Sequence, residues 1–452
     1  MPARTASRRS KGSPVRKRHR RCILVILDGL GDHGHGMLGG QTPLQAACTP
    51  NLDRLAALGM NGLYHAHLQG VALPSEIAHF LMFGYELQDF PGRGYLEAVG
   101  YNIPLTPGDV ALLGRIFTVR EEEQRLILAV EDPKVDPTTC QILQKEIHYY
   151  EAAGVEIEFI PTKGIQGVLV LRGEVSPDIT DSNPIHEGRP LMQVLPLQGK
   201  EQDARVRRTC QALNDYLLWA YRRLCRHPLN QNRPARKLPA LNAVGLQRAG
   251  QFRPVVPFED RWGLRPLALA TGPLYRGLGA FLGMPLIPLR DTRYVEADLR
   301  ERLRLARMLP GYDFVYVHTK APDVAAHTKN PHHKKRVIEI LDRAFAYALN
   351  EIVPDENILL VVTADHSTNS AGSMIHSGEA VPLTMIGATT RRDAVARFDE
   401  VSAAGGCLSL VRGPELMYLI LNFLDRAKLF GLRDSPLDQP FFPGPATPLL
   451  VD

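Results

Sequence analysis

The chain has 452 residues, beyond the length at which one hydrophobic core keeps growing, so two domains are expected, one of them inserted into the other. Its formal net charge of +5 comes from nine Lys and Arg residues before the first apolar run, and the remaining 44 basic and 48 acidic residues give a net charge of −4. This mildly acidic body argues against nucleic acid as a partner, and the lack of any apolar run of about 18 residues argues against a membrane-spanning helix.

The first 21 residues form a basic leader with Ser, Pro and Gly but few apolar side chains. Such a segment buries too little apolar surface to offset the entropy lost on ordering, so it is predicted to be disordered. A solvated tail or a start-site artefact is the simpler interpretation, and a basic arm that contacts RNA or a membrane surface is the alternative. A signal peptide is not expected, because the apolar run at 22–27 is short and Asp28 follows it at once.

The six cysteines are scattered along the chain without close pairs, which argues against a zinc ribbon or a disulfide framework. They are Cys22, Cys48, Cys140, Cys210, Cys225 and Cys407. A reducing, cytoplasmic setting fits this usage. The oligomeric state is left open by the sequence.

The first 105 residues alternate strand and helix patterns, which is typical of an α/β fold. The apolar run at 23–27 predicts a buried strand, and 49–58 predicts a helix with Thr49 as N-cap, Pro50 at its first position and Gly59 as its stop. Partly helical spacing at 74–83 places Ser75 beside a helix N-terminus, where backbone N–H groups attract phosphate.

The pattern changes between about residues 106 and 234, which we interpret as an inserted α+β domain. The expected strands are at 110–119, 125–130, 155–160 and 167–171, and the expected helices at 138–153 and 203–225. Pro and polar residues at 226–239 break the periodicity and predict a return linker.

The α/β pattern resumes from residue 235, so the predicted fold is a mostly parallel sheet flanked by helices, interrupted by the inserted domain. Strands are expected at 240–246, 267–270, 314–318, 358–364 and 382–387, and helices at 273–282, 295–308, 332–350 and 413–427. Residues 22–105 and 235–452 would then form one catalytic domain, with 1–21 as its leader.

Side chains able to bind metal stand at the ends of these elements. Asp28 follows one strand, and Asp365 and His366 follow another, where open α/β sheets place their ligands. Asp323 and His327 are four residues apart, so a helix that begins at Pro322 puts both on one face. With His376 and Ser75 they predict a two-metal site around a serine nucleophile.

The chemistry follows from the serine. A serine hydroxyl is protonated at neutral pH, and a divalent ion bound by Asp28, Asp365 and His366 could lower its pKa, while a second ion at Asp323, His327 and His376 would polarise a phosphate. Manganese, zinc and magnesium all suit such mixed ligands. Taken singly, each residue has a plainer interpretation as a turn, a helix cap, a loop residue or a solvated helix face. His332 and His333 are assigned to a solvated surface.

The chain resembles the alkaline phosphatase superfamily and, within it, the archaeal-type cofactor-independent phosphoglycerate mutases, from about residue 22 to 431. The motifs that carry the resemblance are Ser75-Glu-Ile-Ala-His79, Lys320-Ala-Pro-Asp323, Thr363-Ala-Asp-His-Ser-Thr368 and residues 25–32, 39–46, 49–55, 83–85, 92–94 and 376–378. The resemblance implies that Asp28, Ser75, Asp365 and His366 bind one ion and that Asp323, His327 and His376 bind the other.

The resemblance also implies a glycolytic isomerase, an intramolecular phosphotransferase that interconverts 3-phosphoglycerate and 2-phosphoglycerate through a phosphoserine on Ser75. The inserted domain would hold the glycerate while it re-orients. If water reached the phosphoserine first, the same site would be a phosphatase, so a phosphohydrolase or a phosphomutase for another small phosphate or phosphonate is the alternative. A metal-stabilised binding protein is the third hypothesis.

The sequence departs from the family pattern around the substrate. The family has Gly before the serine and Asp-Thr after it, whereas this chain has Pro74 before Ser75, and Glu76 and Ile77 after it. An arginine expected at 113 is a leucine, and Arg115, on the same strand face, could substitute for it. The cationic candidates for binding a small phosphorylated acid are Arg93, Arg115, Arg248 and Lys320.

Overall fold

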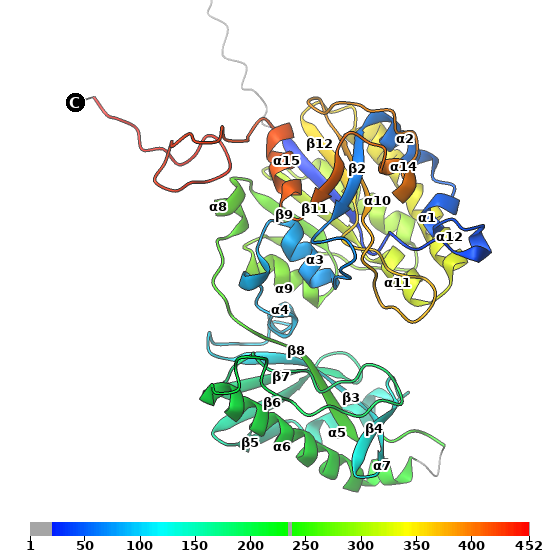
Figure 1. The fold of residues 1–452 in the computed structure, drawn as a ribbon, viewed down its shortest axis with the longest axis vertical. Coiled ribbons are helices and arrows are strands. Elements are labelled where there is room, and N and C mark those ends of the chain that lie inside the picture. The colour runs from blue at the N-terminus through cyan, green and yellow to red at the C-terminus, as the bar shows by residue number, and fades with distance from the viewer. Residues whose placement is uncertain (1–19, 234–236, 452) are drawn as a thin grey trace, which may run out of the picture.

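A computed structural model describes residues 20–233 and 237–451 and contains two separate sheets (Figure 1). The larger sheet has eight strands in the order β10-β9-β11-β1-β12-β13-β2-β14. Their bounds are β1 (Arg21–Leu27), β2 (Met60–His65), β9 (Pro266–Ala270), β10 (Leu286–Pro288), β11 (Phe314–Thr319), β12 (Ile358–Thr363), β13 (Val381–Ile386) and β14 (Ser409–Arg412). We call this sheet and its helices the large unit.

The centre of the large sheet is parallel. β1 pairs in parallel with β11 on one side and with β12 on the other, and all three strands are buried along nearly their whole length. Such strands read as continuous apolar runs because helices cover both faces. β13 runs antiparallel to both β12 and β2. The carboxyl ends of β1, β11 and β12 therefore meet at one edge of the sheet.

The helices of the large unit follow the expected α/β alternation. They are α1 (Pro43–Ala46), α2 (Pro50–Leu58), α3 (Ser75–Met82), α4 (Arg93–Gly100), α8 (Phe258–Trp262), α9 (Pro273–Phe281), α10 (Val295–Met308), α11 (Ala321–His327), α12 (Pro331–Asp342), α13 (Phe345–Tyr347), α14 (Glu400–Ala403) and α15 (Glu415–Phe423). Among the residues described, none of the helices is long and apolar enough to cross a bilayer.

The second sheet lies below the large unit in Figure 1 and has the order β4-β3-β7-β6-β5, with β8 paired to β3. Its elements are β3 (Val110–Glu122), β4 (Arg125–Val130), α5 (Pro137–Glu146), β5 (Tyr149–Ala152), β6 (Val155–Pro161), β7 (Gln166–Gly173), α6 (Ala204–Arg226), α7 (Pro228–Asn232) and β8 (Ala243–Gln251). All its pairings are antiparallel. We call this sheet and its helices the small unit.

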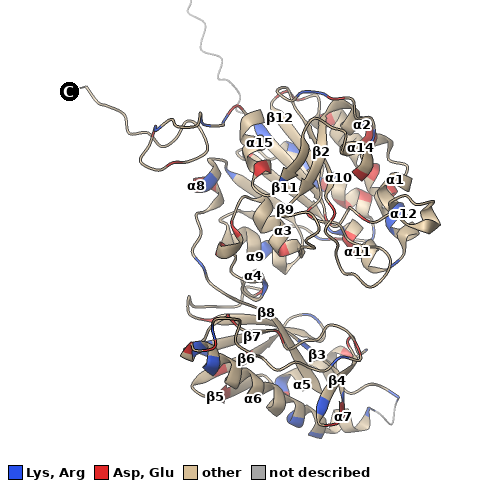
Figure 2. Cartoon of the chain, viewed as in Figure 1, with Lys and Arg blue, Asp and Glu red and all other residues tan. Residues whose placement is uncertain are grey.

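The small unit has its own core because α6 is amphipathic. Val206, Leu213 and Tyr216 are fully buried and join the cluster that includes Ile157 and Phe159 of β6. Lys and Arg positions stand out along the same helix in Figure 2. A helix with one apolar and one charged face packs its apolar face on the sheet.

Helix α4 lies where the two units meet (Figure 1). A Cβ added at Gly94 would come 2.1 Å from the carbonyl oxygen of Ala111 in β3, and one added at Gly100 would come 1.8 Å from that of Pro273 in α9. Both positions therefore require glycine, because a larger residue would push the backbones apart. The close approach ties α4 to both units at once.

Most predicted elements are confirmed, and the differences lie mainly in the small unit. The helix expected at 138–153 ends at Glu146, because Tyr149 and Tyr150 enter β5, which turns back through Ala153 and Gly154, both at positive φ. The strand expected at 240–246 in the large sheet is β8, which pairs with β3 of the small unit. The small sheet thus extends beyond the expected boundary at 234, as far as Gln251.

Smaller differences concern other segments. The linker at 226–239 contains the short helix α7, and the helix expected at 332–350 is divided into α12, α13 and a π-helical turn, η4 (Ala348–Ile352). β2 was not predicted, because Asn61 and Gly62 interrupt its apolar pattern. Residues 1–19 of the leader lie outside the described residues.

Candidate active site

Two neighbouring strands deliver the first group of acidic and imidazole side chains. Asp28 directly follows β1, and Asp365 and His366 come just after β12, the parallel neighbour of β1. The backbone N–H of Gly29 donates to Oδ1 of Asp365 at 3.1 Å, and Gly29 makes the turn at a φ of 66°. All three side chains are buried, so two carboxyl groups stand close together at the sheet edge.

Ser75 reaches the same place from helix α3. It is the first residue of that helix, and its Oγ lies 3.0 Å from Nε2 of His366. Pro74 precedes it in extended conformation, so the chain enters the helix sharply. The hydroxyl therefore sits at a helix N-terminus, where free N–H groups favour an anion.

Helix α11 delivers the second group. Nε2 of His327 lies 3.3 Å from Oδ1 of Asp323, one helical turn away as the spacing predicted. Nε2 of His376 lies 3.7 Å from the same Asp323 oxygen. Nζ of Lys320 lies 3.2 Å from Asp323 and 3.6 Å from Asp28, so it joins the two groups.

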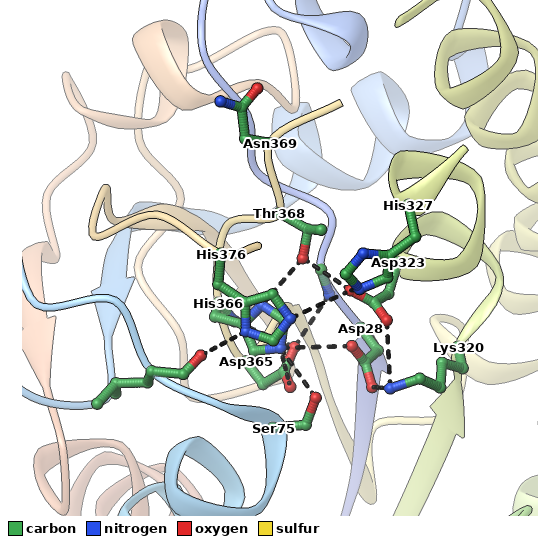
Figure 3. A network of polar contacts seen from close by, with 12 residues as sticks. Asp28, Ser75, Lys320, Asp323, His327, Asp365, His366, Thr368, Asn369 and His376 are labelled. Carbon is green, nitrogen blue, oxygen red and sulfur yellow. Dashed lines mark hydrogen bonds and ion pairs between the residues drawn. The ribbon is translucent and has the colours of Figure 1, made fainter. Parts of the chain in front are cut away.

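The structure brings all seven predicted side chains into one cluster (Figure 3). Donor atoms of Asp28, Asp365 and His366 lie within 4.8 Å of one another, and so do those of Asp323, His366 and His376. His366 thus belongs to both groups, and His327 stands at the exposed rim with 41% of its side chain accessible. Two adjacent three-ligand groups share one imidazole.

The donor set fits divalent cations. Asp28 Oδ1 and Asp365 Oδ2 are buried carboxylate oxygens without a hydrogen-bond partner among the described residues, and Asp323 Oδ2 faces the ammonium group of Lys320 at 3.2 Å. A buried charge left unpaired costs several kcal/mol, and a bound cation would offset that cost. Three carboxylates face a single nearby ammonium group, that of Lys320, in the described part of the chain.

The pKa shifts of three of these side chains follow mainly from burial. Burial, together with the charge of Asp28, raises the pKa of Asp365 to about 8. Burial and the nearby His366 lower the pKa of His376 to about 4, and burial lowers the pKa of His366 as well. The two imidazoles are therefore neutral at pH 7 and have a free nitrogen lone pair to offer a metal.

Sequence reasoning missed the residues that hold Asp28 in place. Oδ2 of Asp28 accepts hydrogen bonds from the Tyr275 hydroxyl at 2.5 Å and from Nε2 of His318 at 2.9 Å, and both side chains are buried. His318 stands near the end of β11 and could have been found by the strand-end rule used for Asp365. Tyr275, within α9, had no such signal.

Two further partners were also missed. His79 lies one turn after Ser75, and its Nδ1 bonds the Ser75 carbonyl at 2.8 Å and lies 3.4 Å from Oδ2 of Asp365. The Thr368 hydroxyl donates to Asp323 at 2.8 Å and lies 3.1 Å from Nδ1 of His366. A histidine four residues after the serine was the available signal for His79.

A cleft of about 690 Å³ opens beside Ser75, between the two units. Three of the four predicted cationic residues, Arg93, Arg248 and Lys320, line it together with Ser75. Arg115 lines an adjoining cavity of about 230 Å³, which it shares with Arg93 and Arg248. Its guanidinium also pairs with Glu131 at 2.8 Å and with Asp132 at 3.7 Å.

His332 and His333 are exposed, as expected, but the adjacent Lys334 is buried. Its Nζ donates to the carbonyl oxygens of Gly31 and Thr368 at 2.8 Å each and pairs with Asp32 at 3.2 Å. The ammonium group thereby joins the loop after β1 to the loop after β12, which carries His366.

Comparison with known proteins identifies relatives along nearly the whole chain. A family model described as 2,3-bisphosphoglycerate-independent phosphoglycerate mutase matches residues 56–230. The mutase 2 of that name from Methanocaldococcus jannaschii is 38% identical over 429 residues, which cover 92% of this chain and 96% of the relative. The Methanopyrus kandleri mutase is 35% identical over 423 residues, 91% of this chain and 98% of the relative.

Two solved structures share the fold. A protein from Pyrococcus horikoshii superposes with a TM-score of 0.73 at 25% identity and covers 92% of this chain and 100% of its own. A cofactor-independent phosphoglycerate mutase from Thermoplasma acidophilum superposes with a TM-score of 0.60 at 27% identity and covers 90% and 100%. Both comparisons include the small unit as well as the large one.

Proposed function

The chain belongs to the 2,3-bisphosphoglycerate-independent phosphoglycerate mutases, and from this premise we propose that Ser75 carries the phosphoryl group as 3-phosphoglycerate and 2-phosphoglycerate interconvert. The observation that carries the proposal is the position of the Ser75 hydroxyl. It lies at a helix N-terminus, 3.0 Å from His366, and on the wall of a cleft lined by three cationic side chains.

Two divalent ions are part of the proposal. Asp28, Asp365 and His366 would hold one beside Ser75, and Asp323, His376 and His327 would hold the other, with manganese, zinc or magnesium as candidates. When bound, the ions would lower the pKa of the serine hydroxyl and offset the charge of the phosphoryl group. The unpartnered carboxylate oxygens support this assignment.

Phosphoryl transfer would proceed in two steps, through Ser75. The Ser75 oxygen attacks phosphorus, the bond from phosphorus to the substrate oxygen breaks, and the freed hydroxyl of glycerate takes up a proton while the serine loses one. The neighbouring hydroxyl then attacks the phosphoserine and restores Ser75. Lys320 and the N–H groups that begin α3 favour the negative charge of the phosphoryl group throughout.

The small unit is proposed to act as a cap that grips the glycerate. Its arginines Arg115 and Arg248 lie on the cleft side, and a guanidinium group binds a carboxylate or phosphate through paired N–H donors. Retention is essential, because a glycerate that left before the second transfer would expose the phosphoserine to water. The inserted domain expected at 106–234 would on this proposal extend to Gln251.

A coupled assay tests the function directly. The protein, loaded with Mn²⁺, is given 3-phosphoglycerate together with enolase, and both phosphoenolpyruvate formation and free phosphate are followed. We expect phosphoenolpyruvate in excess of free phosphate. Free phosphate without phosphoenolpyruvate would instead indicate a phosphohydrolase. The observation that favours this alternative is that the Arg115 guanidinium already pairs with Glu131 and Asp132, which leaves it less free to hold the glycerate.

A further inference from the structure

Glu76, the residue after the nucleophile, is a carboxylate buried beside the place where a phosphate is received. It is 1% exposed and is the second residue of α3. An anion in this position repels an incoming phosphate and is costly to bury, so its presence calls for a specific partner. Both of its oxygens have one.

The two oxygens of Glu76 hold two different arginines. Oε1 accepts from Nη1 of Arg248 at 2.5 Å, and Oε2 lies 3.4 Å from Nη1 of Arg93. Arg93 begins α4, whereas Arg248 lies in β8 of the small unit. One carboxylate thus links the helix of the nucleophile to both sides of the cleft.

The backbone at Arg248 is strained in the way that functional positions often are. Its φ is 58°, a left-handed conformation that a long side chain rarely adopts, and its backbone N–H is held by Oδ1 of Asp181 at 2.7 Å. The pairing of β8 with β3 shifts register nearby, between Ala111 and Leu113. The bulge turns this position out of the regular strand and toward Glu76.

Each arginine has N–H groups left over for a ligand. About a third of each side chain remains accessible, and both line the cleft that contains Ser75. Arg248 has no other carboxylate partner in the part of the chain that the structure describes, whereas Nε of Arg93 also donates to Glu97 at 2.7 Å. When one nitrogen of an arginine is held by a carboxylate, the planar guanidinium group keeps one orientation. Less conformational entropy is then lost when the arginine binds an anion.

We propose that Glu76 is a positioning residue, whose carboxylate holds Arg93 and Arg248 so that their free N–H groups bind the carboxylate or phosphate of the substrate next to Ser75. This inference rests on the function proposed above. The residue does not touch the reacting atoms. It acts through the two guanidinium groups.

Steady-state kinetics of Glu76→Gln with 3-phosphoglycerate test the proposal. The amide of glutamine keeps the shape of the Glu76 side chain but removes the negative charge that holds both guanidinium groups in place. We expect kcat to fall by roughly 10- to 100-fold and KM to change by less than about threefold, since small misplacements of a substrate slow transfer this much. Two controls are the melting temperature and the number of bound Mn²⁺ ions, both expected to match the wild type.

Other outcomes of this experiment would overturn the proposal. A lower KM with unchanged kcat would mean that Glu76 merely reduces the positive charge of the cleft. A lower melting temperature with full kcat would mean that it is only a structural link between the units. The variant Glu158→Gln is a matched control, because it breaks the Arg172–Glu158 pair of 2.9 Å on the small sheet, and it should behave as wild type.

A second variant keeps the test decisive if Glu76→Gln does not fold. Arg248→Lys retains the positive charge but loses the planar guanidinium group with its paired N–H donors, and it should lower kcat by a similar factor. Where Glu76→Gln does fold, the double variant should lower kcat no further than the larger single effect, because residues that act through each other are not additive. Full kcat in Arg248→Lys, or additive losses, would contradict the proposal. A wild type that forms no 2-phosphoglycerate would refute the function itself, a separate result.

Discussion

Nε2 of His366 lies 3.0 Å from Oγ of Ser75, although 291 positions separate the two residues in the chain. The same nitrogen lies 3.2 Å from Asp365 and 3.6 Å from Asp28. The hydroxyl is therefore surrounded by groups that bind cations. Of the described residues that line the cleft, Ser75 and Ser373 carry a hydroxyl, and only that of Ser75 contacts His366. Ser75 is the acceptor that this arrangement favours.

Replacing Ser75 with alanine should abolish phosphoryl transfer and leave the fold and the ions in place. The serine oxygen forms the bond to phosphorus, so kcat/KM should fall by roughly 10⁴-fold or more. Intact-protein mass spectrometry after mixing with 3-phosphoglycerate measures the phosphoenzyme directly. A mutant that still gains a phosphoryl group would show that another residue accepts it.

Replacing Asp323 with alanine should remove one of two bound ions. The substitution leaves neutral imidazoles to hold a dication, and affinity falls when the anionic ligand is lost. Elemental analysis of the desalted protein should give about one ion per chain in place of two. His332→Ala is the control, because that histidine is exposed and outside the cluster, and its ion count should stay at the wild-type value.

Two ions remaining per chain in Asp323→Ala would contradict the assignment of the second group. The carboxylate also accepts from Thr368 at 2.8 Å and lies 3.2 Å from Lys320. Both partners would lose an acceptor, so a small drop in melting temperature is expected as well. The ion count separates the two effects, because it does not depend on stability once the protein is folded.

Replacing Tyr275 with phenylalanine should weaken the ion bound at Asp28. The hydroxyl donates to Asp28 Oδ2 at 2.5 Å and, with His318, turns the other oxygen toward His366. Loss of such an outer partner lowers metal affinity by about 10-fold or more. Titration calorimetry with Mn²⁺ measures the change in Kd.

Tyr85→Phe is the matched control for Tyr275→Phe. It removes a hydroxyl that donates to the Val256 carbonyl at 2.9 Å, in a buried residue outside the cluster. Its Kd for Mn²⁺ should equal that of the wild type. An unchanged Kd in Tyr275→Phe would mean that His318 alone orients the Asp28 carboxylate.

The positions of the proposed ligands could be predicted from the sequence because their signals are local. Asp28 and Asp365 follow apolar runs, and parallel strands bring such ends to one edge. Asp323 and His327 share a helix face through their spacing alone. In each of these cases, a short stretch of sequence was enough to predict both the helix or strand and the place of the side chain on it.

The surroundings of these side chains depend on strand and helix pairings that a single sequence does not show. Glu76 meets Arg248 only because β8 joins the small sheet, and the apolar run of β8 fits either sheet equally well. Tyr275 faces Asp28 across a separation of 247 positions, from the interior of an ordinary amphipathic helix. These contacts depend on how elements far apart in the chain pair and pack, and the hydrophobic periodicity of a sequence does not reveal such pairing.

Replacing the buried Lys334 with methionine should destabilise the folded protein. The methionine fills similar volume but removes one donor from each of Asp32 and the carbonyl oxygens of Gly31 and Thr368, and it removes the only ammonium group that pairs with Asp32 among the described residues. Breaking a buried pair by removing one partner lowers the free energy of unfolding by about 3–5 kcal/mol. Urea denaturation of the metal-loaded protein measures this change.

The neighbouring Lys335→Met supplies the comparison, because Lys335 pairs with Glu339 at 2.9 Å on the same helix but is partly exposed. A surface pair of this kind contributes about 0–1 kcal/mol, so the two adjacent lysines should differ several-fold in their effect on the free energy of unfolding. Equal effects would contradict the role given to Lys334. A selective loss would show that a buried ammonium group holds together the two loops that bring Asp28 and His366 close to Ser75.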